Sequence, residues 1–127
     1  SKPTRERVLI LLHNPVENYK QSFIIMRKIE RQMQSAIRNR TNWSKANTSV
    51  EVDTVGDTTV RLHGNRIATI YNNGDIQLSS CGWETVTTKS RLNAILDTFL
   101  SGIGIYQKDF VWYIGKDTFF DGYVIHR

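Results

Sequence analysis

The chain has 127 residues, of which 39% are hydrophobic and 23% are charged. This length favours a single domain, residues 1–127, that buries about two-thirds of the surface of the unfolded chain. No apolar run approaches the ~20 residues of a membrane-spanning helix, and the single cysteine excludes an internal disulfide. These features predict a cytoplasmic protein without membrane contact.

The net charge of +5 is unevenly distributed along the chain. Residues 1–45 contain ten Lys or Arg and three acidic residues, a net charge of +7, whereas residues 46–127 carry a net charge of −2. Such an asymmetry indicates an anionic partner, or it only keeps the protein in solution. We expect a basic, helical N-terminal region, residues 1–46, followed by a β-rich region with one helix, residues 47–127.

Two helical segments are predicted on either side of Pro15. Residues 4–12 form a short helix capped by Thr4, although the same apolar run also suits a strand. Residues 16–38 form the longest predicted helix, because apolar side chains recur there at near-heptad spacing: Val16, Tyr19, Phe23, Met26, Ile29, Met33 and Ile37. At about 35 Å this helix is long for so small a domain. We therefore expect part of its apolar stripe to pack on another subunit.

The middle of the chain changes from helical to strand periodicity. Residues 39–49 are polar and are predicted to form a linker or an ordered loop, with Trp43 as an anchor. Beyond them, apolar and polar residues alternate in four short runs separated by turn signals such as Asn73-Gly74. This pattern predicts a four-stranded antiparallel meander over residues 49–55, 58–63, 66–71 and 75–80.

One more helix is predicted over about residues 89–100. Its apolar positions share one helical face: Leu92, Ile95, Leu96 and Phe99. Thr87 or Thr88 is expected to cap the helix, and Gly102 to stop it. Two or three further strands follow, with a turn at Lys108-Asp109. Because helices and strands are segregated along the chain, the predicted fold class is α+β, with an antiparallel sheet on which the 89–100 helix packs.

Little in the sequence points to catalysis. The three histidines, His13, His63 and His126, have no metal-ligand spacing with another ligand. Most aspartates lie at predicted turns, where turn formation explains them. Cys81 would be a nucleophile if His63 lay beside it, but a small half-buried cysteine next to a glycine is the simpler interpretation. We therefore predict a binding protein rather than an enzyme, with no metal and no cofactor.

The best candidate site surrounds the start of the 89–100 helix. A helix N-terminus has unpaired amide N–H groups and a partial positive charge, so it suits a phosphate. Side chains that could stack on a base or bind its polar groups gather there: Trp83, Thr85, Thr87, Thr88, Lys89, Arg91 and Asn93. The alternative is that Trp83 fills the gap between sheet and helix while the threonines only cap the helix.

A second candidate is a basic stripe along the 16–38 helix, formed by Arg27, Arg31 and Arg38. These cations would bind an anion and, together with Arg40, a nucleic acid, with strong salt dependence. The alternative is an ordinary solvated helix face.

Several short motifs resemble those of small phage-encoded proteins: NTSV, LHGNRIA, CGW, TTKSRLNAIL and VWYI. Over about residues 47–114 the chain also resembles the first family of Thoeris anti-defence proteins. These phage sponges sequester cyclic ADP-ribose signals made by bacterial TIR-domain enzymes, and some also hold cyclic oligonucleotides. In that family an aromatic residue, a Phe, and an Asn ten positions later line the ligand pocket. Trp83 and Asn93 have this spacing, and the larger indole needs a wider slot.

The resemblance implies a non-catalytic homo-oligomer with pockets at its subunit interfaces, acting in the cytoplasm of the infected bacterium. The leading hypothesis is therefore sequestration of a cyclic nucleotide immune signal. Trp83 would stack on the adenine, Asn93 would hydrogen-bond, and Lys89 and Arg91 would bind the diphosphate. Two alternatives stay open: a nucleic-acid-binding module that uses the basic helix, and a phage inhibitor that binds a host protein.

Overall fold

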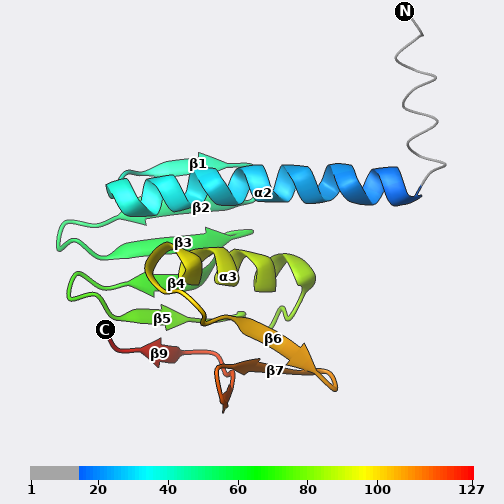
Figure 1. Ribbon diagram of the computed structural model, residues 1–127. Coiled ribbons are helices and arrows are strands. Elements are labelled where there is room, and N and C mark those ends of the chain that lie inside the picture. The colour runs from blue at the N-terminus through cyan, green and yellow to red at the C-terminus, as the bar shows by residue number, and fades with distance from the viewer. Residues whose placement is uncertain (1–14) are drawn as a thin grey trace, which may run out of the picture.

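A computed structural model describes residues 15–127, so the helix predicted over residues 4–12 lies outside the described residues. The α+β class predicted from the sequence is confirmed (Figure 1). In chain order the elements are α2 (Pro15–Asn39), β1 (Trp43–Lys45), β2 (Thr48–Val52), β3 (Thr58–Leu62), β4 (Asn65–Ile70), β5 (Ile76–Leu78), α3 (Val86–Phe99), β6 (Ile105–Lys108), β7 (Val111–Ile114), β8 (Asp117–Thr118) and β9 (Tyr123–Ile125).

The strands form two antiparallel sheets. The larger sheet has the order β1-β2-β3-β4-β5-β9, and the smaller has the order β6-β7-β8. The predicted meander is confirmed as β2 to β5, in which each strand pairs with the next along the chain. Two strands were not predicted to join this sheet: β1 arises inside the expected linker and pairs with β2, and the C-terminal β9 returns to pair with β5.

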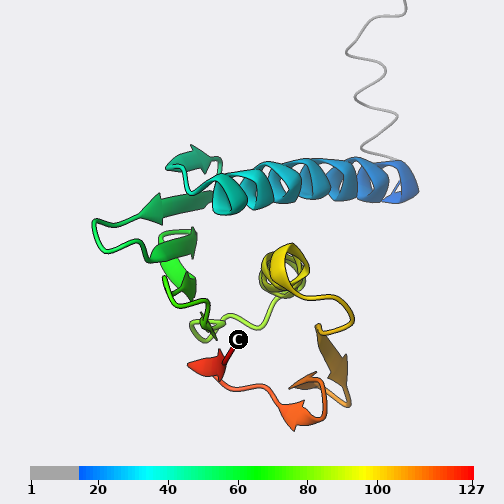
Figure 2. The ribbon, with the colours of Figure 1, turned by 60° about the vertical axis from the view of Figure 1, so that its left-hand side comes forward.

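Helix α3 lies at the centre, with α2, the larger sheet and the smaller sheet on different sides of it (Figure 2). Six of its side chains are buried: Thr88, Arg91, Leu92, Ala94, Ile95 and Leu96. The predicted apolar face therefore contacts the core, where each fully buried Leu or Ile contributes about 1.5–3 kcal/mol. The burial of Arg91 was not predicted. It arises because α2 and β2 cover a second side of α3, and this arrangement cannot be read from the local sequence.

Helix α3 begins earlier than predicted. Thr85 has an extended backbone, with φ −105° and ψ 165°, and its Oγ1 accepts a hydrogen bond from the backbone N–H of Thr88 at 3.1 Å. Thr85 is therefore the N-cap. The prediction that Thr87 or Thr88 caps the helix was wrong, because both lie inside its first turn.

Helix α2 runs past the edge of the larger sheet (Figures 1 and 2). Its C-terminal part packs on the core through Ile29, Met33 and Ile37, whereas Ile24 and Ile25 are more than half exposed. In the predicted apolar stripe, Ile29, Met33 and Ile37 are thus buried, whereas Phe23 is 37% exposed. Neither helix of residues 15–127 combines the length and the apolar character that a membrane span requires.

Candidate functional site

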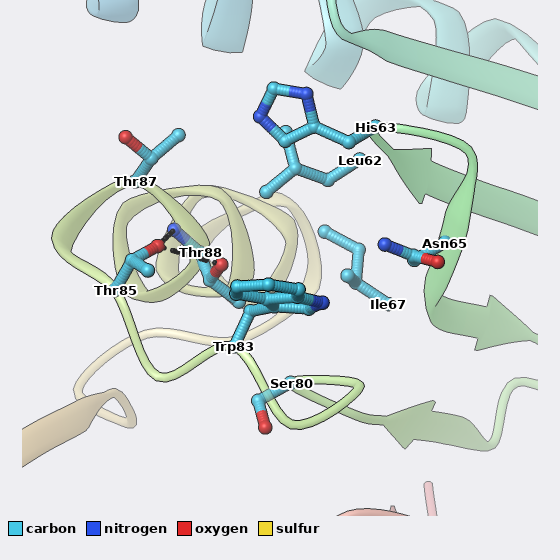
Figure 3. Close-up of a pocket in the computed structure, with 9 residues that line it drawn as sticks. All are labelled: Leu62, His63, Asn65, Ile67, Ser80, Trp83, Thr85, Thr87 and Thr88. Carbon is cyan, nitrogen blue, oxygen red and sulfur yellow. Dashed lines mark hydrogen bonds between the residues drawn. The ribbon is translucent and has the colours of Figure 1, made fainter.

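A pocket of about 440 Å³ lies beside the start of α3 (Figure 3). Three segments line it, namely the β3–β4 hairpin, the chain after β5 and the first turn of α3, through Leu62, His63, Asn65, Ile67, Ser80, Trp83, Thr85, Thr87 and Thr88. Its volume falls in the range of roughly 300–1,000 Å³ that is usual for small-molecule pockets. We refer to it as the Trp83 pocket.

Trp83 forms one wall of this pocket. Its side chain is 63% exposed, and Figure 3 shows the indole facing Leu62 and His63 across the pocket. The backbone of Trp83 is held at both ends, since its N–H donates to the oxygen of Ser80 and its oxygen accepts from the N–H of Thr85, both at 2.9 Å. The indole therefore does not fill the gap between sheet and helix, and one ring face is open for stacking.

Asp121 holds the corner that carries Trp83. Its Oδ1 accepts hydrogen bonds from the backbone N–H of Ser80 at 2.7 Å and from the Ser80 hydroxyl at 2.8 Å, and its Oδ2 accepts from the N–H of Gly82 at 3.2 Å. Cys81 and Gly82 both have positive φ, 55° and 81°, which reverses the chain there. Sequence reasoning missed Asp121, because nothing local connects it to a corner 39 residues earlier.

Two polar residues on the rim were also missed as site residues. His63 lies in the two-residue turn between β3 and β4, and Asn65 begins β4. Neither the imidazole of His63 nor the amide of Asn65 hydrogen-bonds to another group of the described chain. Both are therefore free to bind a ligand in the Trp83 pocket. Only the tertiary fold brings this hairpin to the start of α3.

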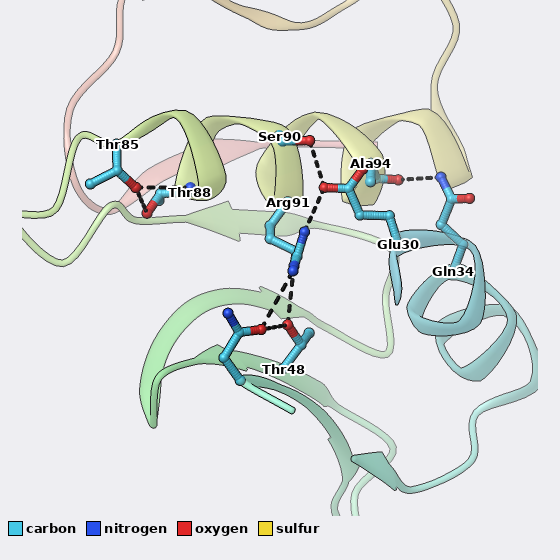
Figure 4. A network of polar contacts seen from close by, with 9 residues as sticks. Glu30, Gln34, Thr48, Thr85, Thr88, Ser90, Arg91 and Ala94 are labelled. Atoms are coloured by element: carbon cyan, nitrogen blue, oxygen red, sulfur yellow. Dashed lines mark hydrogen bonds and ion pairs between the residues drawn. The ribbon is translucent and has the colours of Figure 1, made fainter. Parts of the chain in front are cut away.

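Arg91 points away from the pocket and into a buried network (Figure 4). Only 2% of its surface is exposed. Its Nη1 donates to Oε2 of Glu30 at 2.8 Å, and its Nε donates to Oγ1 of Thr48 at 3.0 Å. The hydroxyl of Ser90 donates to the same Glu30 oxygen at 2.6 Å. The network joins α3 to α2 and β2, so Arg91 could bind a phosphate only after leaving its ion pair.

Asn93 is likewise occupied within the fold. Its Nδ2 donates to the backbone oxygen of Ile105 at 3.0 Å, and its Oδ1 accepts from the N–H of Ile105 at 2.6 Å. These two bonds fasten β6 to α3. Asn93 is not among the residues that line the Trp83 pocket, because it lies about 10 Å along the helix axis from Val86. The structure thus does not bring Trp83 and Asn93 together.

Lys89 belongs to a second groove, of about 500 Å³, between α2 and α3. This groove also contains Arg27 and Arg31 of the predicted basic stripe, whereas Arg38 is not part of its lining. The guanidinium of Arg27 lies 4.6 Å from the centre of the Phe23 ring. The acidic residues of the groove are Glu30, which pairs with Arg91, and Asp97. Its three basic residues outnumber them, so the groove is cationic on balance.

The clear pKa shifts lie away from both hollows. A hydrogen bond from His126 lowers the pKa of Asp75, and a hydrogen bond to Asp117 raises the pKa of Tyr123. In the part of the chain that the structure describes, no cluster of three or more His, Cys, Asp or Glu side chains could hold a metal ion.

Comparison with family models matches residues 26–126 to the Kyanoviridae Gp96 protein. The chain belongs to this family. It is therefore a phage protein, as its short motifs predicted. The Kyanoviridae Gp96 match includes the whole Trp83 pocket and α3, and it begins just after Phe23, Ile24 and Ile25 of α2. No curated protein and no solved structure matches the chain, and the relation to Thoeris anti-defence proteins stays a prediction.

Proposed function

We propose that this phage protein is a non-catalytic binding protein for a small ligand with a flat heteroaromatic ring, which stacks on Trp83. The observation that carries the proposal is an indole that is mostly exposed and yet forms the wall of a pocket. Stacking of one base on an aromatic side chain contributes about 1–3 kcal/mol. Leu62 and Ile67, which also line the pocket, would supply apolar contacts to the ring of the ligand.

Polar groups around the pocket would orient the ligand. The Asn65 amide offers both a donor and an acceptor to the edge of a base, and the His63 imidazole offers a further hydrogen bond. The first amide N–H groups of α3 and the partial positive charge at this helix end favour an anionic substituent on the ligand. Thr87, in the first turn of α3, also lines the pocket. These groups replace Arg91 and Asn93, whose polar atoms are engaged inside the fold.

A cyclic nucleotide has the flat base and the phosphate that this arrangement favours. The resemblance to Thoeris anti-defence sponges supports cyclic ADP-ribose isomers and cyclic oligonucleotides as the ligands. The protein would act by sequestration, holding the signal without changing it chemically. Its effect in the cell would then depend on the amount of protein relative to signal.

Isothermal titration calorimetry with cyclic ADP-ribose isomers, cyclic oligonucleotides and AMP tests this proposal. We expect at least one to bind, and Trp83→Ala to weaken binding by roughly 5- to 150-fold, the equivalent of ~1–3 kcal/mol. Phe120→Ala is the matched control, because it removes another exposed aromatic side chain that does not line the pocket. Mass spectrometry should recover the ligand unchanged. Absence of binding at millimolar ligand, or equal affinity of Trp83→Ala, would refute the proposal.

The groove between α2 and α3 supports a second candidate, nucleic-acid binding. It brings Arg27, Arg31 and Lys89 together, and none of them forms an ion pair with another described residue. A mobility shift that weakens steeply between roughly 50 and 200 mM salt, and that is lost in Arg27→Ala/Arg31→Ala, would support it. The Arg38→Ala variant, outside the groove, is the control.

A further inference from the structure

The hairpin between β6 and β7 carries an unexpected residue at its tip. Lys108 pairs with Val111, so Asp109 and Phe110 form a two-residue turn. Both have positive φ, 51° and 66°. Turns of this type favour Gly at the second position, because a side chain is strained in the left-handed conformation.

Elsewhere the same chain uses glycine for this purpose. The turn between β3 and β4 is His63-Gly64, and the corner before Trp83 is Cys81-Gly82, with positive φ at both residues in each pair. Among residues 15–127, Phe110 is the one large apolar residue with positive φ. Its side chain is 90% exposed, so packing within the subunit does not offset the strain. Strain of this kind points to a function outside the monomer.

The rest of the hairpin provides a rigid support for Phe110. On its inner face, Ile105, Trp112 and Ile114 are buried in the core, so the hairpin cannot move independently of it. On the outer face, the ring of Tyr106 stacks on that of Tyr113, with 5.6 Å between centroids. The turn that carries Phe110 is therefore held in a fixed place, and its side chain is exposed there.

A groove that fits such a ring lies on the same molecule, beside α2 and the start of α3. It has a volume of about 460 Å³ and an apolar lining that includes Phe23, Ile25, Met26, Ile29 and Val86. Val86 is 70% exposed and Ile25 is 59% exposed, so the groove is uncovered within the described chain. An apolar cavity of about 150 Å³ already holds benzene, so a phenyl ring fits. We call it the Val86 groove.

We propose that Phe110 of one copy inserts into the Val86 groove of a second copy, which produces a head-to-tail homo-oligomer. Charge favours this arrangement over a contact between two α2 helices. The latter would bring Arg27 and Lys28 of both copies together, whereas the hairpin turn carries one Lys and one Asp, Lys108 and Asp109, and is neutral. Because knob and groove are different surfaces, the contact is heterologous and leads to a closed ring or an open chain.

Phe110→Gly tests the knob, because assembly and stability should change in opposite directions. Glycine relieves the strain of the turn, so the midpoint of thermal unfolding should rise. Removal of the ring should convert the oligomer to a monomer in native mass spectrometry at high micromolar protein. Phe120→Ala is the matched control, because it removes another exposed aromatic side chain and should leave the oligomer intact.

Val86→Asp tests the groove. An acidic residue in the first turn of α3 suits the helix dipole, so the fold should persist, while the charge excludes an apolar ring. Val86→Asp should therefore also be monomeric. Phe110 does not line the Trp83 pocket, so ligand affinity should stay unchanged in Phe110→Gly, and the two proposals can fail separately. Val86→Asp is assayed for assembly alone, because its carboxylate would repel an anionic ligand at the start of α3.

Mixing the two variants distinguishes a contact between knob and groove from a contact between two like surfaces. Phe110→Gly keeps an intact groove and Val86→Asp keeps an intact knob, so an equimolar mixture should form a dimer with one subunit of each and nothing larger. A monomeric wild type, an oligomer that survives either substitution, or a mixture that stays monomeric overturns the proposal. The proposal is also overturned if the wild type alone is a monomer and Phe110 is needed instead for a complex with a host protein or a lipid vesicle.

Discussion

Arg91 and Trp83 lie eight residues apart near the start of α3, and their surroundings are opposite. The charged Arg91 is buried, with its donors paired to Glu30 and Thr48. The apolar Trp83 is mostly exposed, on a corner held by Asp121. Arginine can be buried here because α2 supplies the counter-charge, and tryptophan is exposed because a tight chain reversal positions it. From residue type alone, one would expect the tryptophan to be buried and the arginine to be exposed. The predicted site therefore divides into a structural half, around Arg91, and an open half, around Trp83.

The strongest test of the structural half is Arg91→Ala. It leaves the Glu30 carboxylate buried without its partner, so we expect a loss of about 3–5 kcal/mol in the free energy of unfolding. Urea denaturation followed by circular dichroism measures it. Lys89→Ala is on the same helix, but the Lys89 side chain forms no hydrogen bond or ion pair with a described residue, so it should change stability by less than ~0.5 kcal/mol.

A double substitution checks that the loss comes from the unpaired charge. Replacing both partners by apolar residues, Glu30→Leu with Arg91→Met, should cost less than Arg91→Ala alone, because no charge is left without a partner. A double variant as unstable as the two single substitutions combined would contradict this account.

Asn93→Ala should have the next largest effect on stability. It removes both hydrogen bonds to Ile105 and leaves backbone groups unpaired, so we expect a loss of about 1–3 kcal/mol with little change in ligand affinity. Asn65→Ala is the matched variant, because its amide has no partner in the described chain and lines the pocket. It should weaken ligand binding and leave stability unchanged. If calorimetry showed weaker binding for Asn93→Ala but not for Asn65→Ala, and denaturation showed no loss of stability for Asn93→Ala, Asn93 would belong to the ligand site.

Trp83→Ala should barely alter stability. Because the indole is mostly exposed, the free energy of unfolding should change by less than ~0.5 kcal/mol. The same substitution at the buried Trp112, which is 2% exposed, should cost about 3–5 kcal/mol. Thermal and chemical denaturation of both variants would compare them. A large loss in Trp83→Ala would mean that its ring supports the fold.

The smallest expected effect is on the pH dependence of stability, through Asp75. Hydrogen bonds from His126 and from the N–H of Arg127 lower the pKa of this carboxyl in the folded protein. Its contribution to stability is therefore present above the ordinary carboxyl pKa of about 4 and is lost as the pH falls through the lowered value. Asp75→Asn should flatten the decline of the melting temperature in acid. Asp97→Asn, an exposed aspartate, should leave that profile unchanged.

The elements of the fold were predictable wherever the signal is local. Alternating residues and the Asn73-Gly74 turn predict the meander, because strand pleat and turn geometry act over a few residues. Leu92, Ile95 and Leu96 predict the buried face of α3 for the same reason. The position of Trp83 just before a helix start was also predictable. Its exposure could not be predicted, because it depends on Asp121.

The sequence by itself determined the strand and helix periodicities, the basic N-terminal helix and the presence of an indole beside a helix N-terminus. The tertiary structure decided the rest: that Arg91 pairs with Glu30, that Asn93 binds Ile105, that His63 and Asn65 complete the Trp83 pocket, and that β9 pairs with β5. Each of these depends on groups from distant parts of the chain. Periodicity describes which face of an element is apolar, whereas the groups that meet across two elements are set only when the whole chain packs.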